Sequence, residues 1–160
     1  MNKTAAAAPP FEPEFVAALK TMFEEKIVFN QVLGLRIKSI KPERVTGRLA
    51  MKPELIGHYA HQRLHGGVIS ACLDAMAGLA IMAAIGARHR DETPQQRLQR
   101  FARLGTIDLR VDYLRPGVGE HFDLRAEVMR LGSRVASTRM EFLAADGELV
   151  ATGSAAYIVS

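Results

Sequence analysis

The chain has 160 residues, enough for one domain with a substantial core and too few for two. Its net charge is +4, and its arginines are spread over several segments with no basic tail, which favours an anionic small ligand over nucleic acid. Cys72 is the only cysteine, so an intrachain disulfide is excluded and a reducing, cytoplasmic location is expected.

The start of the chain, MNKTAAAAPPFE, has an apolar block too short for a signal peptide. We expect residues 1–12 to form a flexible tail and residues 13–160 to form a single domain. Pro13 to Phe29 predicts a helix, with a proline at its first position and apolar residues at helical spacing. Residues 35–40 and 44–52 then predict two strands that form a hairpin about Pro42.

Gly66 to Ala87 is an almost unbroken apolar run of 22 residues, the length of a membrane-spanning helix. It is rich in Gly and Ala, and Asp74 would cost about 2.5–3.5 kcal/mol near a bilayer centre. We therefore predict a buried helix of a globular domain and no membrane span. One stripe of this helix has small side chains and includes Asp74, and the opposite stripe has bulky side chains. We therefore expect Asp74 to face a narrow crevice. The first stripe is Gly67, Ser70, Ala71, Asp74, Ala77, Gly78 and Ile81, and the second is Ile69, Leu73, Met76, Leu79 and Ala83.

Thr93 and Gln96 have the spacing of a capping box and predict a short helix that ends near Leu104. Its arginines at positions 97, 100 and 103 are expected to form a solvated face, with phosphate binding as the alternative. Strands are predicted over residues 105–115, 121–129, 133–143 and 148–159, with Asp146-Gly147 as a hairpin turn. The fold class is therefore α+β: about six mostly antiparallel strands around one long helix.

Four motifs in this order resemble the hotdog-fold thioesterases, and within them the PaaI-like branch. They are LGLRI (33–37), LHGGVISACLD (64–74), VDYLRPG (111–117) and DGELVATGSAAY (146–157). The resemblance implies a central helix wrapped by a curved antiparallel sheet of about five to six strands. It also implies hydrolysis of acyl-CoA thioesters by a homodimer or dimer of dimers, with sites at the subunit interface. No metal or other cofactor is implied, since CoA is part of the substrate.

The resemblance also assigns roles to residues of this chain. Asp74 matches the catalytic carboxylate, and Thr106 matches a position that helps to hold the attacking water. Gly66 matches the backbone N–H that polarises the thioester carbonyl, and His65 matches the histidine beside that carbonyl. In this family, Asp74 and Thr106 of one subunit would face His65 and Gly66 of the other.

One position departs from the family pattern. Relatives often have an asparagine six residues before the histidine, where this chain has Tyr59. His61, Gln62 or Tyr59 itself are the candidates to replace it in binding the substrate.

The residues support the same chemistry without the resemblance. Gly66 and Gly67 open a helix, so their N–H groups are expected to be unpaired donors for an oxyanion. Asp74 could act as a general base on water or as a nucleophile that forms an anhydride, or it could be a structural buried acid bonded to Ser70 or to a strand. Cys72 points to another face of the helix and is expected to be inert core.

Further residues are candidates for contacts with CoA or a metal. Arg115, Arg130, Ser133 and Arg134 lie at strand ends where family members often contact CoA. His58, His61 and His65 could bind a metal if helical, but no acid lies near at ligand spacing, so we expect no metal site. The alternatives to a thioesterase are a non-catalytic acyl-CoA-binding or sensing module, a hydratase of enoyl thioesters, and an assembly domain without a ligand.

Overall fold

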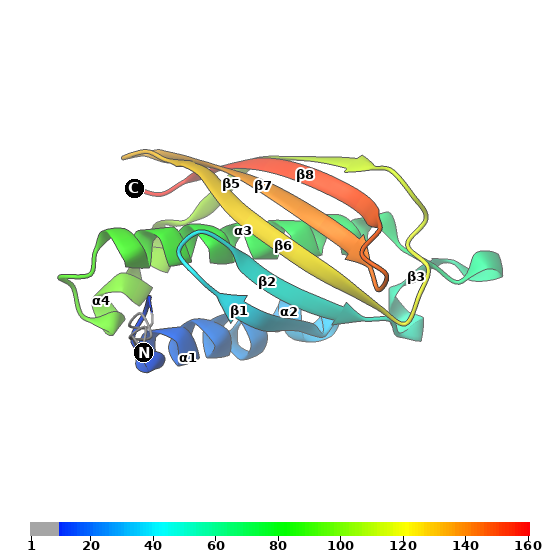
Figure 1. Cartoon of the computed structure of the whole chain (residues 1–160), viewed down its shortest axis with the longest axis horizontal. Coiled ribbons are helices and arrows are strands. Elements are labelled where there is room, and N and C mark those ends of the chain that lie inside the picture. The colour runs from blue at the N-terminus through cyan, green and yellow to red at the C-terminus, as the bar shows by residue number, and fades with distance from the viewer. Residues whose placement is uncertain (1–9) are drawn as a thin grey trace, which may run out of the picture.

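A long helix runs through the middle of the molecule, and a curved sheet covers one side of it (Figure 1). The computed structural model describes residues 10–160. The helix, α3 (Gly66–Arg88), has the bounds predicted from the apolar run to within one residue. All strand pairs of the sheet are antiparallel, in the order β1-β2-β6-β7-β8-β5. The predicted architecture is confirmed.

The six strands of the sheet all correspond to predicted strands, because apolar and polar residues alternate along them; one face of each strand except β5 is buried. Their bounds are β1 (Leu35–Ile40), β2 (Val45–Ala50), β5 (Gly105–Tyr113), β6 (His121–Leu131), β7 (Val135–Ala144) and β8 (Leu149–Ile158). A small hairpin of β3 (Ile56–His58) and β4 (Arg63–Leu64) was not predicted, since strands this short carry no alternation.

The bulky stripe of α3 faces the sheet. Leu73, Met76 and Leu79 have no exposed surface, and α3 packs mainly on β6 and β7. Each fully buried side chain of this size contributes about 1.5–3 kcal/mol to folding. Within residues 10–160, α3 is the one helix long and apolar enough to cross a membrane, and 72% of its most apolar stretch is buried in this core.

Cys72 lies inside the same core. It has no exposed surface, and burial raises the pKa of its thiol to about 12. The thiol therefore stays protonated at neutral pH, as expected for an inert core cysteine.

The helix predicted over Pro13 to Phe29 is interrupted, which corrects that prediction. The segment forms α1 (Pro13–Thr21), a π turn (Met22–Lys26) and, after an extended Ile27, a separate helix α2 (Val28–Leu33). The Asn30 side chain donates a hydrogen bond of 2.9 Å to the backbone oxygen of Phe23. This bond satisfies a carbonyl at the interruption and fixes the angle between the two helices.

The N-terminal helices lie on the side of α3 that the sheet leaves open (Figure 1). Of the tail expected at residues 1–12, residues 1–9 lie outside the described residues. Phe11 is buried beside Phe15, with 5.3 Å between their ring centroids. Glu12 forms an ion pair with Arg97.

The predicted capping box of Thr93 and Gln96 is present and starts α4 (Pro94–Gln99), which continues as a 3₁₀ turn (Arg100–Arg103). The expected solvated arginine face is wrong for Arg97, which has no exposed surface. Its guanidinium lies 4.2 Å from the centroid of the Phe15 ring and donates to the backbone oxygen of Gly86 at 3.3 Å and to Glu12 at 2.8 Å.

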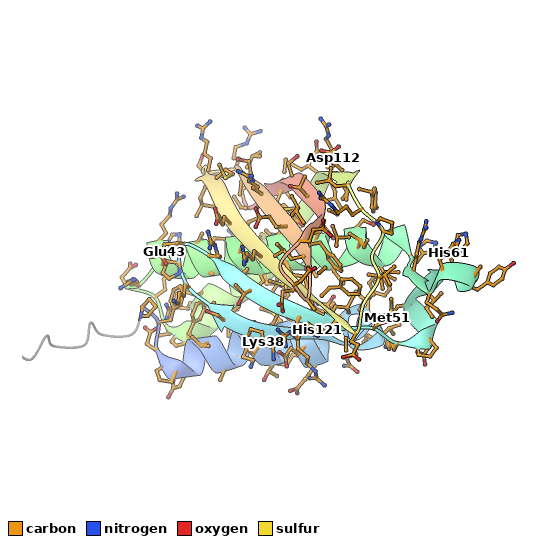
Figure 2. The ribbon with its side chains drawn as sticks, turned by 45° about the vertical axis from the view of Figure 1, so that its right-hand side comes forward. Lys38, Glu43, Met51, His61, Asp112 and His121 are labelled. Atoms are coloured by element: carbon orange, nitrogen blue, oxygen red, sulfur yellow. The ribbon has the colours of Figure 1, made fainter. Side chains whose placement is uncertain are left out.

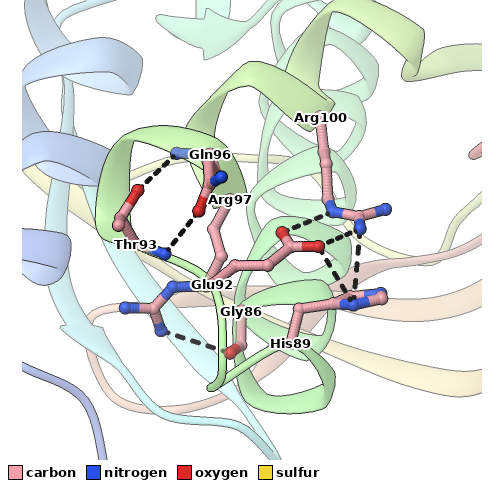
Figure 3. A network of polar contacts seen from close by, with 7 residues as sticks. All are labelled: Gly86, His89, Glu92, Thr93, Gln96, Arg97 and Arg100. Atoms are coloured by element: carbon pink, nitrogen blue, oxygen red, sulfur yellow. Dashed lines mark hydrogen bonds and ion pairs between the residues drawn. The ribbon is translucent and has the colours of Figure 1, made fainter.

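Arg97 is buried because α4 lies over the junction of α1 and the end of α3. Gly86 allows this close approach, since a Cβ atom there would lie 2.4 Å from the Phe15 ring. The hydrogen bond from Arg97 lowers the pKa of the Glu12 carboxyl. Arg100 pairs instead with Glu92 (Figure 3), and only Arg103 is exposed as predicted.

Arg97→Ala is expected to lower the free energy of unfolding by about 3 kcal/mol. The change removes a desolvated cation–π contact and leaves a cavity in place of a large buried side chain. Urea denaturation measures the loss. Arg103→Ala is the matched control on the same segment and should stay within about 0.5 kcal/mol of wild type. Equal stability of the two variants would contradict the role given to Arg97.

Candidate active site

The carboxylate of Asp74 is held by two hydroxyl groups. Thr106 of β5 donates to Oδ1 of Asp74 at 2.9 Å. The hydroxyl of Tyr157, on β8, also donates to Oδ1 and lies 2.8 Å from the backbone oxygen of Asp74. Both donors bind the same carboxylate oxygen, and no donor from the described part of the chain reaches Oδ2. One oxygen of Asp74 is thus fixed while the other stays available.

A β-bulge turns Thr106 toward Asp74. Simple alternation along β5 would place Ile107 on the inner face and Thr106 on the outer face. The register with β8 shifts here, so that Thr106 lies opposite Tyr157 and Asp108 lies opposite Ala156. The alternation predicted for Ile107 is therefore wrong: its side chain is 57% exposed. The Asp108 carboxylate accepts the Ala156 N–H at 3.1 Å, which replaces a ladder bond at the irregularity.

Tyr157 was not predicted as a site residue. Burial, together with the hydrogen bond to Asp74 and the charge of that carboxylate, raises the pKa of Tyr157 well above the usual tyrosine value. Its hydroxyl therefore stays protonated and serves as a donor at physiological pH. The available signal was its inward position on β8, since a buried tyrosine hydroxyl usually needs a polar partner.

These three side chains form the polar part of a pocket of about 270 Å³. The pocket lies between α3, the π turn and α2, and the turn that follows α4. This arrangement agrees with the narrow crevice expected at the small stripe of α3. The rest of the lining is mostly apolar and consists of Phe23, Ile27, Phe29, Asn30, Ala71, Ala75, Gly78, Phe101, Leu104 and Gly105.

A second polar group lies at the start of α3. His65 caps the helix, and its Nδ1 accepts the N–H of Gly67 at 2.9 Å. Of the two free N–H donors expected at Gly66 and Gly67, the one at Gly67 is not free, because it donates to His65. The N–H of Gly66 has no acceptor within residues 10–160, and Tyr113 donates to the Gly66 oxygen at 3.0 Å. Gly57 permits the packing of His65, since a Cβ atom there would lie 2.7 Å from the His65 Cα atom.

One chain does not bring these two groups together. Gly66 and Asp74 are eight residues apart on α3, about 12 Å along the helix axis. Helix N–H groups point toward the N-terminus, so the donor of Gly66 points away from Asp74. The structure therefore pairs Asp74 with Thr106, and His65 with Gly66 and Gly67, at two separate places.

Tyr59, His61 and Gln62 lie on the projecting tip of the β3–β4 hairpin, close in sequence to the start of α3. Figure 2 shows His61 on this segment, away from the sheet. Tyr59 is 85% exposed, and Gln62 is the one non-glycine residue with a positive φ between residues 10 and 160. In that same range, no three His, Cys, Asp or Glu side chains gather closely enough to hold a metal ion.

The predicted CoA-binding residues are distributed over two places. Arg115 forms an ion pair with Glu148 at 2.6 Å and donates to the backbone oxygen of Leu149. Arg130, Ser133 and Arg134 line an exposed pocket of about 320 Å³ at the turn between β6 and β7. Arg88, at the end of α3, donates to the Gly132 oxygen in this turn. This pocket is at the opposite end of α3 from His65.

Comparisons with known proteins agree with this fold. The pattern of the thioesterase superfamily matches residues 61–151. The medium/long-chain acyl-CoA thioesterase YigI of Escherichia coli (strain K12) is 38% identical over 138 residues, which cover 86% of this chain and 89% of that protein. YigI of Salmonella typhimurium is 39% identical over 140 residues, with the same shares covered.

A crystal structure gives the same result in three dimensions. It is that of a Shewanella oneidensis protein related to the thioesterase superfamily, 40% identical to this chain. The TM-score is 0.86, and the match covers 94% of this chain and 100% of that one. With its central helix wrapped by a six-stranded antiparallel sheet, the chain belongs to the thioesterase superfamily and has the hotdog fold.

Proposed function

We propose that the chain is an acyl-CoA thioesterase of the PaaI-like branch that hydrolyses a CoA thioester to a free acid and CoA. The observation that carries this proposal is the Asp74 carboxylate, held through Oδ1 by two hydroxyls beside an otherwise apolar pocket. Such a pocket suits an acyl chain, and the polar part suits the thioester group. The YigI relatives act on medium- and long-chain acyl-CoA, as their name states.

In this proposal, the free Oδ2 of Asp74 does the chemistry. As a general base it removes a proton from water, whose oxygen attacks the thioester carbon; the C–S bond then breaks and CoA leaves as a thiolate. As a nucleophile, the same oxygen would attack the thioester carbon, the C–S bond would break with CoA leaving as a thiolate, and water would then hydrolyse the mixed anhydride to the free acid and the Asp74 carboxylate. Thr106 and Tyr157 hold the carboxylate in the orientation that both routes require. Neither route uses a metal or another cofactor.

The oxyanion donor would come from a second copy of the chain. The Gly66 N–H is about 12 Å from Asp74 along the same helix, so a single chain leaves the site incomplete. β5 is an edge strand, and it exposes Ile107 by 57% and Tyr113 by 53%. An exposed apolar edge of this kind is suited to pairing with a second copy.

Antiparallel pairing of β5 with itself would complete the site. A register centred on Arg110, counted across the bulge at Ile107, sets Thr106 opposite Tyr113 of the partner subunit. Thr106 is bonded to Asp74, and Tyr113 is bonded to Gly66 in its own chain. The pairing therefore brings the carboxylate of one copy toward the helix start of the other. We propose this homodimer as the active unit, with a dimer of dimers as a further assembly.

Most of the remaining candidates fit this unit as substrate contacts. Arg130 and Arg134 lie beside an open pocket and suit the phosphates of CoA, whereas Arg115 is already paired with Glu148. The hairpin that carries Tyr59, His61 and Gln62 leads directly into His65 and would approach the site with the partner's helix start. We place the protein in the cytoplasm, where Cys72 would stay reduced.

Asp74→Asn is expected to lower kcat for acyl-CoA hydrolysis by a factor of about 100 to 10,000, the usual contribution of a positioned acid or base. A panel of acyl-CoA chain lengths, followed by release of free thiol, measures the effect. Asp123→Asn is the matched control: its side chain is 37% exposed on β6, away from β5, and pairs with Arg48, so activity should be unchanged. An Asp74→Asn variant as active as wild type would refute the proposal. A wild-type protein that binds acyl-CoA without turnover would favour the non-catalytic sensing module.

Tyr157→Phe and Thr106→Val should each lower kcat by about tenfold or more while KM changes little. Each removes one hydrogen bond to a charged acceptor, which contributes roughly 1.5–3 kcal/mol. Thr152→Val is the control, because its hydroxyl donates to the Met140 oxygen within the sheet at 3.1 Å and does not touch Asp74. If KM rises and kcat stays constant, the two hydroxyls do not position the carboxylate for the reaction.

A further inference from the structure

One part of the Asp74 pocket is closed by three large side chains over a glycine. Gly78 lies one turn of α3 beyond Asp74, next to Phe23 and Leu104, and Phe101 lines the same pocket. Phe23 and Phe101 meet edge to face, with 5.7 Å between their ring centroids. A Cβ atom at Gly78 would lie 3.7 Å from Leu104 and 3.8 Å from Phe23. A side chain added at Gly78 would therefore lie in direct contact with Leu104 and Phe23.

We propose that Phe23, Phe101 and Leu104 form an end wall of the pocket beside Gly78. This wall sets the length of the acyl chain that the enzyme accepts. This inference rests on the proposed thioesterase function. An acyl chain whose carbonyl is beside Asp74 extends into the apolar part of the pocket, and its methyl end meets the wall. Each further methylene adds buried contact until the wall is reached, and beyond it the chain has no room.

The wall is anchored on both sides. Phe101 and Leu104 follow α4, which Arg97 fixes to α1 and α3 by its buried contacts with Phe15, Gly86 and Glu12. On the other side, the Asn30 amide holds the backbone of Phe23.

Two further contacts brace the same segment. The capping box of Thr93 and Gln96 fixes the start of α4, and Arg100 binds Glu92 and contacts His89 (Figure 3). These contacts hold the backbone segment that carries Phe101 and Leu104. The length limit should therefore be sharp, as for a rigid wall, and not gradual, as for a mobile lid.

The pocket of about 270 Å³ includes both the polar part at Asp74 and the apolar part at the wall, so an acyl chain occupies only the apolar part beyond the carboxylate. The chain length at which kcat/KM is highest measures the depth of that part.

The test is the chain-length dependence of kcat/KM, from butyryl-CoA to palmitoyl-CoA, in wild type and three variants. In wild type, kcat/KM should rise by up to about fourfold per methylene to an optimum and then fall. Gly78→Val fills the space at the wall and should move the optimum to shorter chains by about two carbons. Phe101→Ala opens the wall and should move it to longer chains by a similar number. Leu98→Ala is the control: it is partly buried on the same segment, lies outside the pocket and should keep the wild-type optimum.

An optimum that stays the same in Gly78→Val and Phe101→Ala, or that moves equally in Leu98→Ala, would overturn the proposal. If one variant fails to fold, the other still tests the wall in its own direction. Absence of turnover by wild type at every chain length would instead refute the thioesterase function. In that case, the Kd values of non-hydrolysable S-alkyl-CoA thioethers, measured by calorimetry on the same variants, still test the wall.

Discussion

A carboxylate on a buried helix loses much of its hydration, and the effective penalty is several kcal/mol unless other polar groups replace the lost water. Asp74 is half-buried, because α3 is covered by the sheet on one side and by the N-terminal helices on the other, and it loses part of its hydration. Thr106 and Tyr157 supply hydroxyl donors to one oxygen, and the pocket keeps the other accessible. The bulge in β5 and the inward tyrosine of β8 are both needed to satisfy this one charge.

The features that could be predicted are those with a regular period. The apolar run marks α3, alternation marks the six strands, and Thr93 with Gln96 marks the start of α4. The bulge at Thr106 was not predictable, because one extra residue reverses the faces of β5 without changing its composition. The burial of Arg97 was also missed, since its partners Phe15 and Gly86 come from segments distant in sequence.

The candidate site could be predicted only in part for a related reason. The small stripe of α3 indicated a crevice at Asp74, but the hydroxyl that comes from Tyr157 depends on the register of β8. The glycines at the helix start indicated oxyanion donors, and the structure leaves the Gly66 N–H free while His65 occupies that of Gly67. Asp74 and the helix start at Gly66 lie at opposite ends of β5. Thr106 at one end binds Asp74, and Tyr113 at the other end binds the Gly66 oxygen. Their separation within one chain is the physical reason to place the site between two copies.

Mixed dimers test this shared site most directly. Gly66→Pro removes the N–H at the first helical position, where proline is well tolerated, and the extended backbone of His65 suits a following proline. Asp74→Asn removes the carboxylate. Each variant alone should be inactive, and a mixed dimer has one site free of both changes. Refolded together at equal amounts, the variants should recover about a quarter of wild-type activity, since half of the dimers are mixed and one of their two sites is intact. No recovery in mixtures that demonstrably contain mixed dimers would show that each site belongs to a single chain.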